Sequence, residues 1–302
     1  MYHKPVLLNE SIEGLGIKPE GTYVDVTFGG GGHSRAILEK LTTGRLIAFD
    51  QDWDAINNII DDSKFTWINH NFRYLKNFLK YHDAIPADGI LADLGVSSHQ
   101  FDEAARGFSL RFSGALDMRM NTSQEKSASE VLNEYAEEEI AAMFRNYGEL
   151  PNASALSRAI INRRKAGAIK TFEDLEATLG KFAQRGKENK FFAKVLQALR
   201  IEINDELAAL QEMLQQAADV LKEGGRLVVI SYHSLEDRLV KNFIKAGNFE
   251  GKQEKDFYGN PRLIFEPVNR KPITPSEKEL RENNRSRSAK LRIATRLKPK
   301  KT

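Results

Sequence analysis

Short runs of consecutive apolar residues alternate with segments of helical periodicity over the first hundred residues. Four runs predict buried strands, at Tyr23–Phe28, Arg45–Asp50, Thr66–Asn69 and Gly89–Leu94. Three intervening segments have the apolar spacing of helices, at Ser34–Leu41, Asp54–Asp61 and Phe72–Tyr81. Strands that alternate with helices in this way predict an α/β fold with a parallel, doubly wound sheet.

The pattern changes at about Ala104, and strand signals are nearly absent up to Leu207. Five segments have helical spacing there, at Ser129–Tyr135, Glu137–Tyr147, Ala153–Ala166, Thr171–Leu179 and Phe191–Ile203. A long helix then begins at Asp205 and runs to about Leu221, and the pair Gly224-Gly225 ends it. The apolar run Arg226–Tyr232 predicts a further strand. We therefore expect a discontinuous α/β domain, 1–103 and 208–302, with residues 104–207 as an inserted helical domain.

The amino-acid composition excludes several kinds of functional site. The 302 residues include no cysteine, which excludes cysteine zinc sites, thiol nucleophiles and disulfides. The six histidines are scattered without metal-ligand spacing, so no metal site is indicated. No segment has the length of a membrane-spanning helix and the first residues lack a signal-peptide profile, so we expect a cytoplasmic protein with no membrane partner.

Charge is distributed unevenly. The region 269–302 holds twelve Lys or Arg against three Glu, a local charge of +9. Since the whole chain carries +3, the first 268 residues carry −6. The basic region is either a solvated terminal arm or a contact for a partner with a phosphate backbone.

Four consecutive glycines, Gly29 to Gly32, follow the first predicted strand. Glycines without a Cβ let a ligand approach the backbone closely. Asp50 follows nineteen residues after Gly31, at the end of the next strand, where an acidic residue reaches ribose hydroxyls. This pattern favours a nucleoside-bearing cofactor over a glycine turn without a ligand. The dinucleotide-binding pattern G-x-G-x-x-G has Ser34 in place of its third glycine. S-adenosylmethionine and NAD therefore both remain candidates for the cofactor.

The carboxyl ends of parallel strands meet at one edge of a sheet. We therefore expect four strand ends to form one site, with Gly29–His33, Asp50, Asn69–Phe72 and Asp93–Ser98.

Five sequence motifs together are similar to those of a known protein family. They are Asp93–Phe108 (DLGVSSHQFDEAARGF), Leu116–Met120 (LDMRM), Ser231–Arg238 (SYHSLEDR), His3–Glu10 and Asn284–Arg292. In sequence and order they resemble the MraW/RsmH family, whose members are S-adenosylmethionine-dependent methyltransferases. The resemblance implies methylation of the exocyclic 4-amino group of a decoding-site cytosine in 16S rRNA of the small ribosomal subunit. It also implies a Rossmann-like class I methyltransferase sheet with an inserted, mainly helical substrate-recognition domain.

Residue by residue, the resemblance places the cofactor contacts on Gly31, Gly32, His33, Asp50, Phe72, Asp93 and Gln100. For catalysis, the candidate hydrogen-bond acceptor for the target amine is Asp93 or a group on Ser231–Ser234, where His233 is the named candidate. A methyltransferase that acts on ring carbon 5 of cytosine normally needs a cysteine, which this chain lacks. An NAD-dependent oxidoreductase and a non-enzymatic RNA-binding factor are the alternatives. The oligomeric state stays open, a homodimer included.

Overall fold

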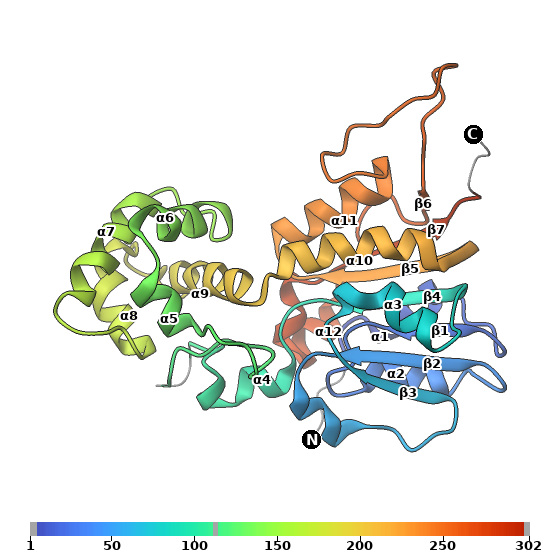
Figure 1. Cartoon of the computed structure of the whole chain (residues 1–302), viewed down its shortest axis with the longest axis horizontal. Helices are drawn as coiled ribbons and strands as arrows, with labels where there is room; N and C mark the ends of the chain where they lie inside the picture. Colours follow the sequence, from blue (N-terminus) through green and yellow to red (C-terminus); the bar gives the residue numbers. More distant parts are fainter. Residues whose placement is uncertain (1–4, 111–113, 299–302) are drawn as a thin grey trace. The chain divides into compact units, whose positions relative to one another are not determined.

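The computed structural model describes residues 5–110 and 114–298, so the start of the His3–Glu10 motif lies outside it. The chain separates into two compact units, shown in Figure 1. The first unit contains residues 1–95 and 207–302, and the second contains residues 96–206. Within the part of the chain that is described, no helix is long and apolar enough to cross a membrane.

The first unit is built on a seven-stranded sheet (Figure 1). Its strands are β1 (Thr22–Asp25), β2 (Arg45–Asp50), β3 (Phe65–Asn69), β4 (Ala87–Asp93), β5 (Leu221–Ser231), β6 (Phe265–Pro267) and β7 (Lys290–Arg296). The order is β3-β2-β1-β4-β5-β7-β6; the first five strands are parallel, and β7 is antiparallel to both of its neighbours. This order of parallel strands is that of a Rossmann-like, doubly wound sheet, which confirms the predicted α/β fold class.

Helices cover both faces of the sheet (Figure 1). They are α1 (Leu8–Leu15), α2 (Gly32–Leu38), α3 (Leu75–Tyr81), α10 (Glu206–Val220), α11 (Ser234–Ala246) and α12 (Glu277–Glu282). Because side chains alternate along a strand, Val24, Ile47 and Ile90 face a core shared with α3, α10 and α11. Leu46 and Leu91 face the opposite core, to which α1 and α2 contribute. Burial on both faces explains the continuous apolar runs of these strands.

The helix expected over Asp54–Asp61 is instead a 3₁₀ helix, η1 (Trp53–Asn58). Polar side chains in this segment bind backbone groups, which competes with a regular helix. Asp52 accepts from the Asp54 N–H, and Asn58 donates to the carbonyl of Gly29. The expected helix over Phe72–Tyr81 divides into a 3₁₀ turn, η2 (Phe72–Tyr74), and α3.

The long helix ends within one residue of its expected end at about Leu221, but Gly224-Gly225 do not form that end. Helix α10 ends at Val220 and β5 begins at once, with Leu221 paired to Ala87. The pairing then moves to Arg226 opposite Gly89, so residues 222–225 form an irregularity in the strand. Gly224 has φ +76°, a conformation that suits glycine.

The basic region is not a free tail over its described length. Residues Lys290–Arg296 form β7 inside the sheet, a strand that the sequence pattern did not reveal. Leu291 and Ile293 are buried in the same core as α1, and Arg292 donates to Asp237 at 2.7 Å. The sequence of this strand lacks a clear apolar pattern because it contains several Lys and Arg residues. Their side chains are paired or lie at the sheet surface.

The second unit is helical and has its own core. Its helices are α4 (Ser98–Asp102), α5 (Ala128–Glu134), α6 (Glu137–Asn146), α7 (Ala153–Arg164), α8 (Phe172–Leu179) and α9 (Glu188–Asn204). Two of the family motifs meet here. Arg106 donates to the carbonyls of Arg119 and Met120, and the Met120 N–H donates to Asn204 at 2.7 Å. These motif residues therefore hold the loop 116–120 against the end of α9.

Candidate functional site

The strand order reverses between β1 and β4, which is where ligands bind in open α/β sheets. Asp25 ends β1 and Asp93 ends β4. Thr27 joins the two ends, because its hydroxyl accepts from the Asp93 N–H at 2.7 Å and its own N–H donates to Asp25 at 3.1 Å. This pair of neighbouring strand ends is the centre of the candidate site.

Three residues separate the end of β1 from the glycine loop, which turns on positive φ angles, +49° at Gly29 and +73° at Gly31. A Cβ on Gly31 would lie 2.4 Å from the Arg35 Nη1 and 3.0 Å from the Phe28 ring. Gly29 donates its N–H to Asp50 Oδ2 at 2.7 Å. The loop is thus fixed to the end of β2 by its own backbone.

Asp50 has the chemistry that a ribose diol needs. Its Oδ2 accepts from Gly29, its Oδ1 accepts from the Asp52 N–H at 2.9 Å, and each oxygen keeps a lone pair for another donor. Burial raises the pKa of Asp50 to about 6, although the two N–H donors favour the charged form. These residues therefore fit a nucleoside-bearing cofactor.

Gly32 and His33 begin α2 and contact the amino-terminal segment. A Cβ on Gly32 would lie 2.2 Å from Pro5. The His33 side chain is 6% exposed; its Nε2 lies 3.1 Å from the carbonyl of Val6 and its Nδ1 lies 3.8 Å from Asp93 Oδ2. His33 therefore links Val6 to the end of β4, and no side-chain cap hydrogen bond forms at the start of α2.

The end of β3 is tied to the end of β2. Asn69 donates to the carbonyl of Asp50 at 3.0 Å, and Asn71 donates to Gln51 at 2.8 Å. Phe72 follows in η2, partly buried against the sheet core. The structure thus places Phe72 at the strand end beside the one that carries Asp50.

Asp93 receives a hydrogen bond from Tyr232, a residue that the sequence analysis did not single out. The Tyr232 hydroxyl donates to Asp93 Oδ1 at 2.8 Å. Burial raises the pKa of Asp93 to about 6; His33 and the Tyr232 bond oppose this rise, and Asp25 and Glu236 add to it. Burial and the nearby Asp93 raise the pKa of Tyr232 well above 10, so the phenol remains a donor. The position of Tyr232 at the carboxyl end of a predicted strand is the feature of the sequence that could have indicated a role in the site.

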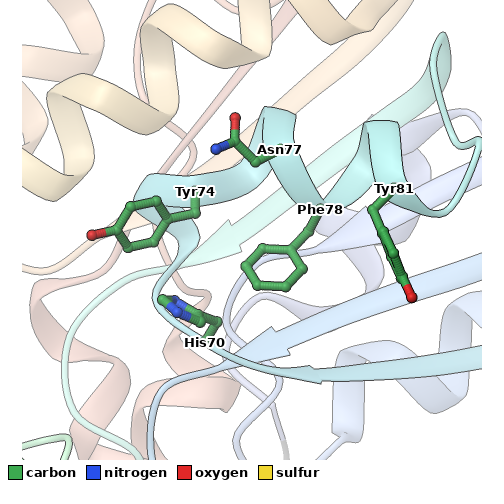
Figure 2. Close-up of a pocket in the computed structure, with 5 residues that line it drawn as sticks. All are labelled: His70, Tyr74, Asn77, Phe78 and Tyr81. Carbon is green, nitrogen blue, oxygen red and sulfur yellow. The ribbon is translucent and has the colours of Figure 1, made fainter.

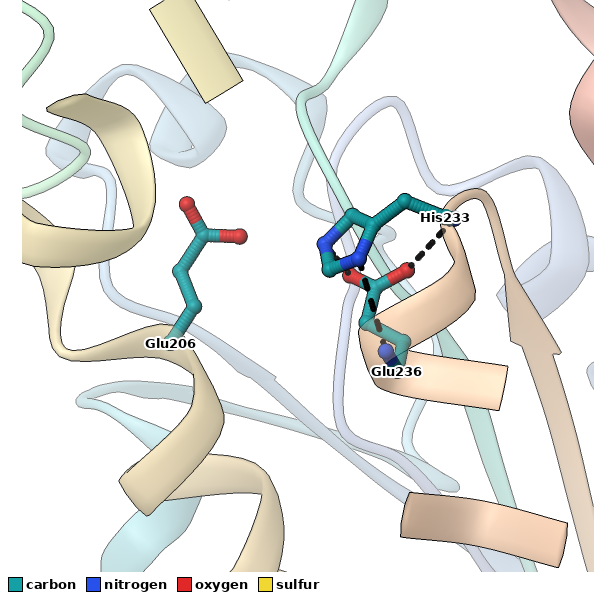
Figure 3. Close-up of side chains that lie close together, drawn as sticks. All are labelled: Glu206, His233 and Glu236. Carbon is teal, nitrogen blue, oxygen red and sulfur yellow. Dashed lines mark hydrogen bonds and ion pairs between the residues drawn. The ribbon is translucent and has the colours of Figure 1, made fainter. Parts of the chain in front are cut away.

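His233 is the N-cap residue of α11. Its Nδ1 accepts from the Glu236 N–H at 3.4 Å, and Glu236 Oε2 accepts from the N–H groups of Tyr232 and His233. The other ring nitrogen, Nε2, lies 3.2 Å from Glu236 Oε1 (Figure 3). Glu206, also drawn there, belongs to the second unit and pairs with Arg200. His233 therefore has a structural role, and its catalytic role stays a prediction.

Gln100 lies in the second unit, buried to 4% exposure. Its Oε1 accepts from the Ser97 N–H at 3.0 Å, and the Ser97 hydroxyl accepts from the Gln100 N–H at 3.2 Å. The two residues form the capping box of α4. A cofactor contact by Gln100 stays a prediction.

A pocket of about 390 Å³ lies along α3 and is shown in Figure 2. Its lining residues are His70, Tyr74, Asn77, Phe78 and Tyr81. The His70 ring centre lies 4.7 Å from that of Tyr74 and 5.0 Å from that of Phe78. None of the predicted cofactor or catalytic residues lines it, so the candidate site is defined by the strand ends.

Comparison with known proteins agrees with the motifs. Residues 1–297 match the MraW methylase family. Curated relatives named ribosomal RNA small subunit methyltransferase H are similar over nearly their whole length. The Christiangramia forsetii protein is 56% identical over 98% of both chains, and the Bacteroides thetaiotaomicron protein is 57% identical over 97% of both. The Flavobacterium johnsoniae protein is 53% identical over 98% of both.

Proposed function

The chain belongs to the MraW methylase family, and we propose that it methylates the exocyclic 4-amino group of a decoding-site cytosine in 16S rRNA of the small ribosomal subunit. The methyl donor is S-adenosyl-L-methionine. The observation that carries the proposal is the partly buried Asp93 carboxylate at the strand-order reversal, on the same sheet edge as the glycine loop and Asp50. Methylation of an amine needs a methyl donor and a proton acceptor side by side, and this sheet edge offers a place for both.

We assign a different portion of S-adenosyl-L-methionine to each of the predicted binding residues. Asp50 accepts hydrogen bonds from the two ribose hydroxyls, Gly31 and Gly32 admit the amino-acid portion beside the backbone, and Phe72 covers the adenine. We assign Gln100 to the same site through the family resemblance. When bound, S-adenosyl-L-methionine supplies an electrophilic methyl group on sulfur.

Asp93 acts on the other reactant. The lone pair of the cytosine amine is delocalised into the ring, so the nitrogen is a weak nucleophile. Asp93 accepts a hydrogen bond from the amine N–H, which localises the lone pair, and it takes the proton that the nitrogen loses as it gains the methyl group. His233 is the second candidate for this acceptor.

The target base must leave its stack to reach a site at a sheet edge. We propose that the helical second unit recognises the RNA around it and that exposed Lys and Arg of the 269–298 region contact phosphates. The partner is the small ribosomal subunit in the cytoplasm, and no membrane takes part.

The direct test incubates the protein with labelled S-adenosyl-L-methionine and small subunits from cells that lack the protein. We expect one methyl group per subunit, recovered as N4-methylcytidine on nucleoside analysis. Label on adenine, guanine or protein alone would contradict the assignment, as would saturable binding of NAD without binding of S-adenosyl-L-methionine.

Replacement of Tyr232 by Phe should change the pH profile. The hydrogen bond from Tyr232 favours the charged form of Asp93, so its loss raises the pKa of Asp93 above about 6. Asp93 must be charged to accept a proton, so kcat falls as pH falls through this pKa. We therefore expect the acid limb of kcat to move to higher pH, with about threefold less activity than wild type at pH 6 and little change at pH 8. An acid limb at the wild-type position would contradict this role for Tyr232. His33, Asp25 and Glu236, which also face Asp93, are unchanged in this variant.

A further inference from the structure

An extended arm, residues 248–263, leaves the first unit between α11 and β6 (orange in Figure 1). Its base is fixed to the end of α11. Phe249 stacks on Phe243 with ring centres 5.1 Å apart, and Asn242 donates to the Phe249 carbonyl at 2.8 Å. Gln253 donates to the carbonyl of Lys245 at 3.0 Å. The base of the arm is therefore held in place by contacts with α11.

The tip is held by its own hydrogen bonds. Asp256 Oδ1 accepts from the N–H groups of Tyr258 and Asn260, each at 2.9 Å. The Gly259 N–H donates to the Asp256 carbonyl, and Gly259 has φ +83°, which completes a tight turn. The arm's two sides are joined below the turn by the pairing of Lys255 with Pro261. None of these bonds uses an aromatic ring.

Two adjacent aromatic side chains project from this turn. Phe257 is 97% exposed and Tyr258 is 85% exposed, more than any other large hydrophobic residue among those described. Their ring centres lie 5.6 Å apart with planes at 87°. Exposed large apolar groups on an ordered turn, unused by the fold, are typical of a binding surface.

The charges around the rings favour an anionic partner. Five exposed cations lie on the end of α11 and the arm: Lys241, Lys245, Lys252, Lys255 and Arg262. The acidic residues of the same stretch are Glu250, Glu254 and Asp256. Asp256 is directed at the N–H groups of its own turn, so Glu250 and Glu254 are the acids on the exposed surface. Aromatic faces beside cations are the combination that binds single-stranded nucleic acid.

We propose that the arm is an RNA contact, in which Phe257 and Tyr258 stack on unpaired bases of the substrate and the neighbouring lysines contact its phosphates. The inference rests on the proposed function, since it takes the methylated RNA as the partner. Stacking on bases tolerates any sequence, so the arm contributes affinity, and the choice of the methylated base belongs to the site at the strand ends.

The test measures methylation of small subunits and their direct binding with the double variant F257A/Y258A. We expect the KM for subunits and the dissociation constant to rise about tenfold, with kcat at saturation and the affinity for S-adenosyl-L-methionine unchanged. The variant F257W/Y258W should retain wild-type affinity, because indole rings also stack. F257L/Y258L should behave like the alanine variant, because leucine is apolar but has no ring face. Tyr81→Ala is the matched control, a tyrosine 81% exposed on α3, and should bind normally.

An unchanged KM in F257A/Y258A would overturn the proposal. So would full affinity in F257L/Y258L, which would indicate a protein partner, or a change of molecular mass in F257A/Y258A, which would indicate self-association. Failure of the proposed function is a separate result: the wild-type protein itself would then leave the subunits unmethylated, while direct binding would still report on the arm.

Discussion

We expect Asp93→Asn to lower kcat at least about 100-fold while the protein stays folded and able to bind S-adenosyl-L-methionine. The loss is expected because an amide cannot take the proton that the target amine releases, and general-base catalysis contributes about 10² or more. The substitution suits its surroundings. The oxygen of the new amide can accept from Tyr232, and its NH₂ group can donate to the Nδ1 of His33, whose Nε2 donates to Val6. Steady-state kinetics at pH 8 check this result.

The same variant should be more stable than the wild type at pH 8. Burial raises the pKa of Asp93 to about 6 in the folded state, from an ordinary value of 3.8. A raised carboxyl pKa means that the folded state holds the proton more tightly, so its stabilising effect is present at low pH and is lost as pH rises through about 6. Above pH 6 the wild type carries a partly buried charge that Asn removes. We expect about 1–2 kcal/mol and a few degrees in thermal melting of the cofactor-free protein.

Two further variants make the prediction specific. Asp88→Asn changes an aspartate at the opposite end of β4, where it accepts from the Thr22 N–H, and should retain turnover. His233→Asn keeps an N-cap residue on α11 while removing the imidazole. If Asp93→Asn kept more than a third of wild-type turnover and His233→Asn lost it, the acceptor would be His233.

We expect Asp50→Ala to weaken binding of S-adenosyl-L-methionine about 100-fold. Two hydrogen bonds from ribose hydroxyls to a charged carboxylate contribute about 1.5–3 kcal/mol each. The variant also leaves the N–H groups of Gly29 and Asp52 without their acceptor, so the glycine loop loses its attachment to β2. Isothermal titration with S-adenosyl-L-methionine at pH 8 measures the effect.

A pH titration separates the ribose contact from general damage to the loop. Burial raises the pKa of Asp50 to about 6, so wild-type affinity should fall as pH drops below 6 and the carboxylate gains a proton. Asp50→Asn has no such titration, and its weaker affinity should lack this component of the pH dependence. Asp61→Ala removes an exposed acid that follows η1 and serves as the control. Equal affinity of wild type and Asp50→Ala would contradict the assignment of Asp50 to the ribose.

The sequence was informative where burial left a simple pattern. Strands β1, β2 and β4 contribute to the cores on both faces, so they appear as apolar runs. The predicted carboxyl ends of β2, β3 and β4 lie within one residue of the observed ends, whereas β1 ends at Asp25, three residues before the predicted Phe28. Because parallel strands end at one edge, the predicted meeting of Asp50 and Asp93 with the glycine loop followed from topology alone.

Other elements depend on contacts that no local pattern encodes. Strand β7 carries Arg292, whose burial is possible only because Asp237 of α11 pairs with it. Tyr232 becomes part of the site through a hydrogen bond to Asp93, 139 positions earlier in the chain. His233 and Gln100 were singled out for chemistry, and the structure shows both in helix caps, a local role that the sequence allowed equally well.

The position of β7 also affects the order in which the protein is made. A chain that emerges from the ribosome amino end first has all of the second unit, residues 96–206, before any of β5 has been synthesised. The sheet of the first unit stays incomplete until Lys290–Arg296, near the end of the chain, can insert between β5 and β6. Domains fold as units during synthesis, so the helical unit can form first. The sheet that carries the candidate site then becomes complete only after β7 has been synthesised.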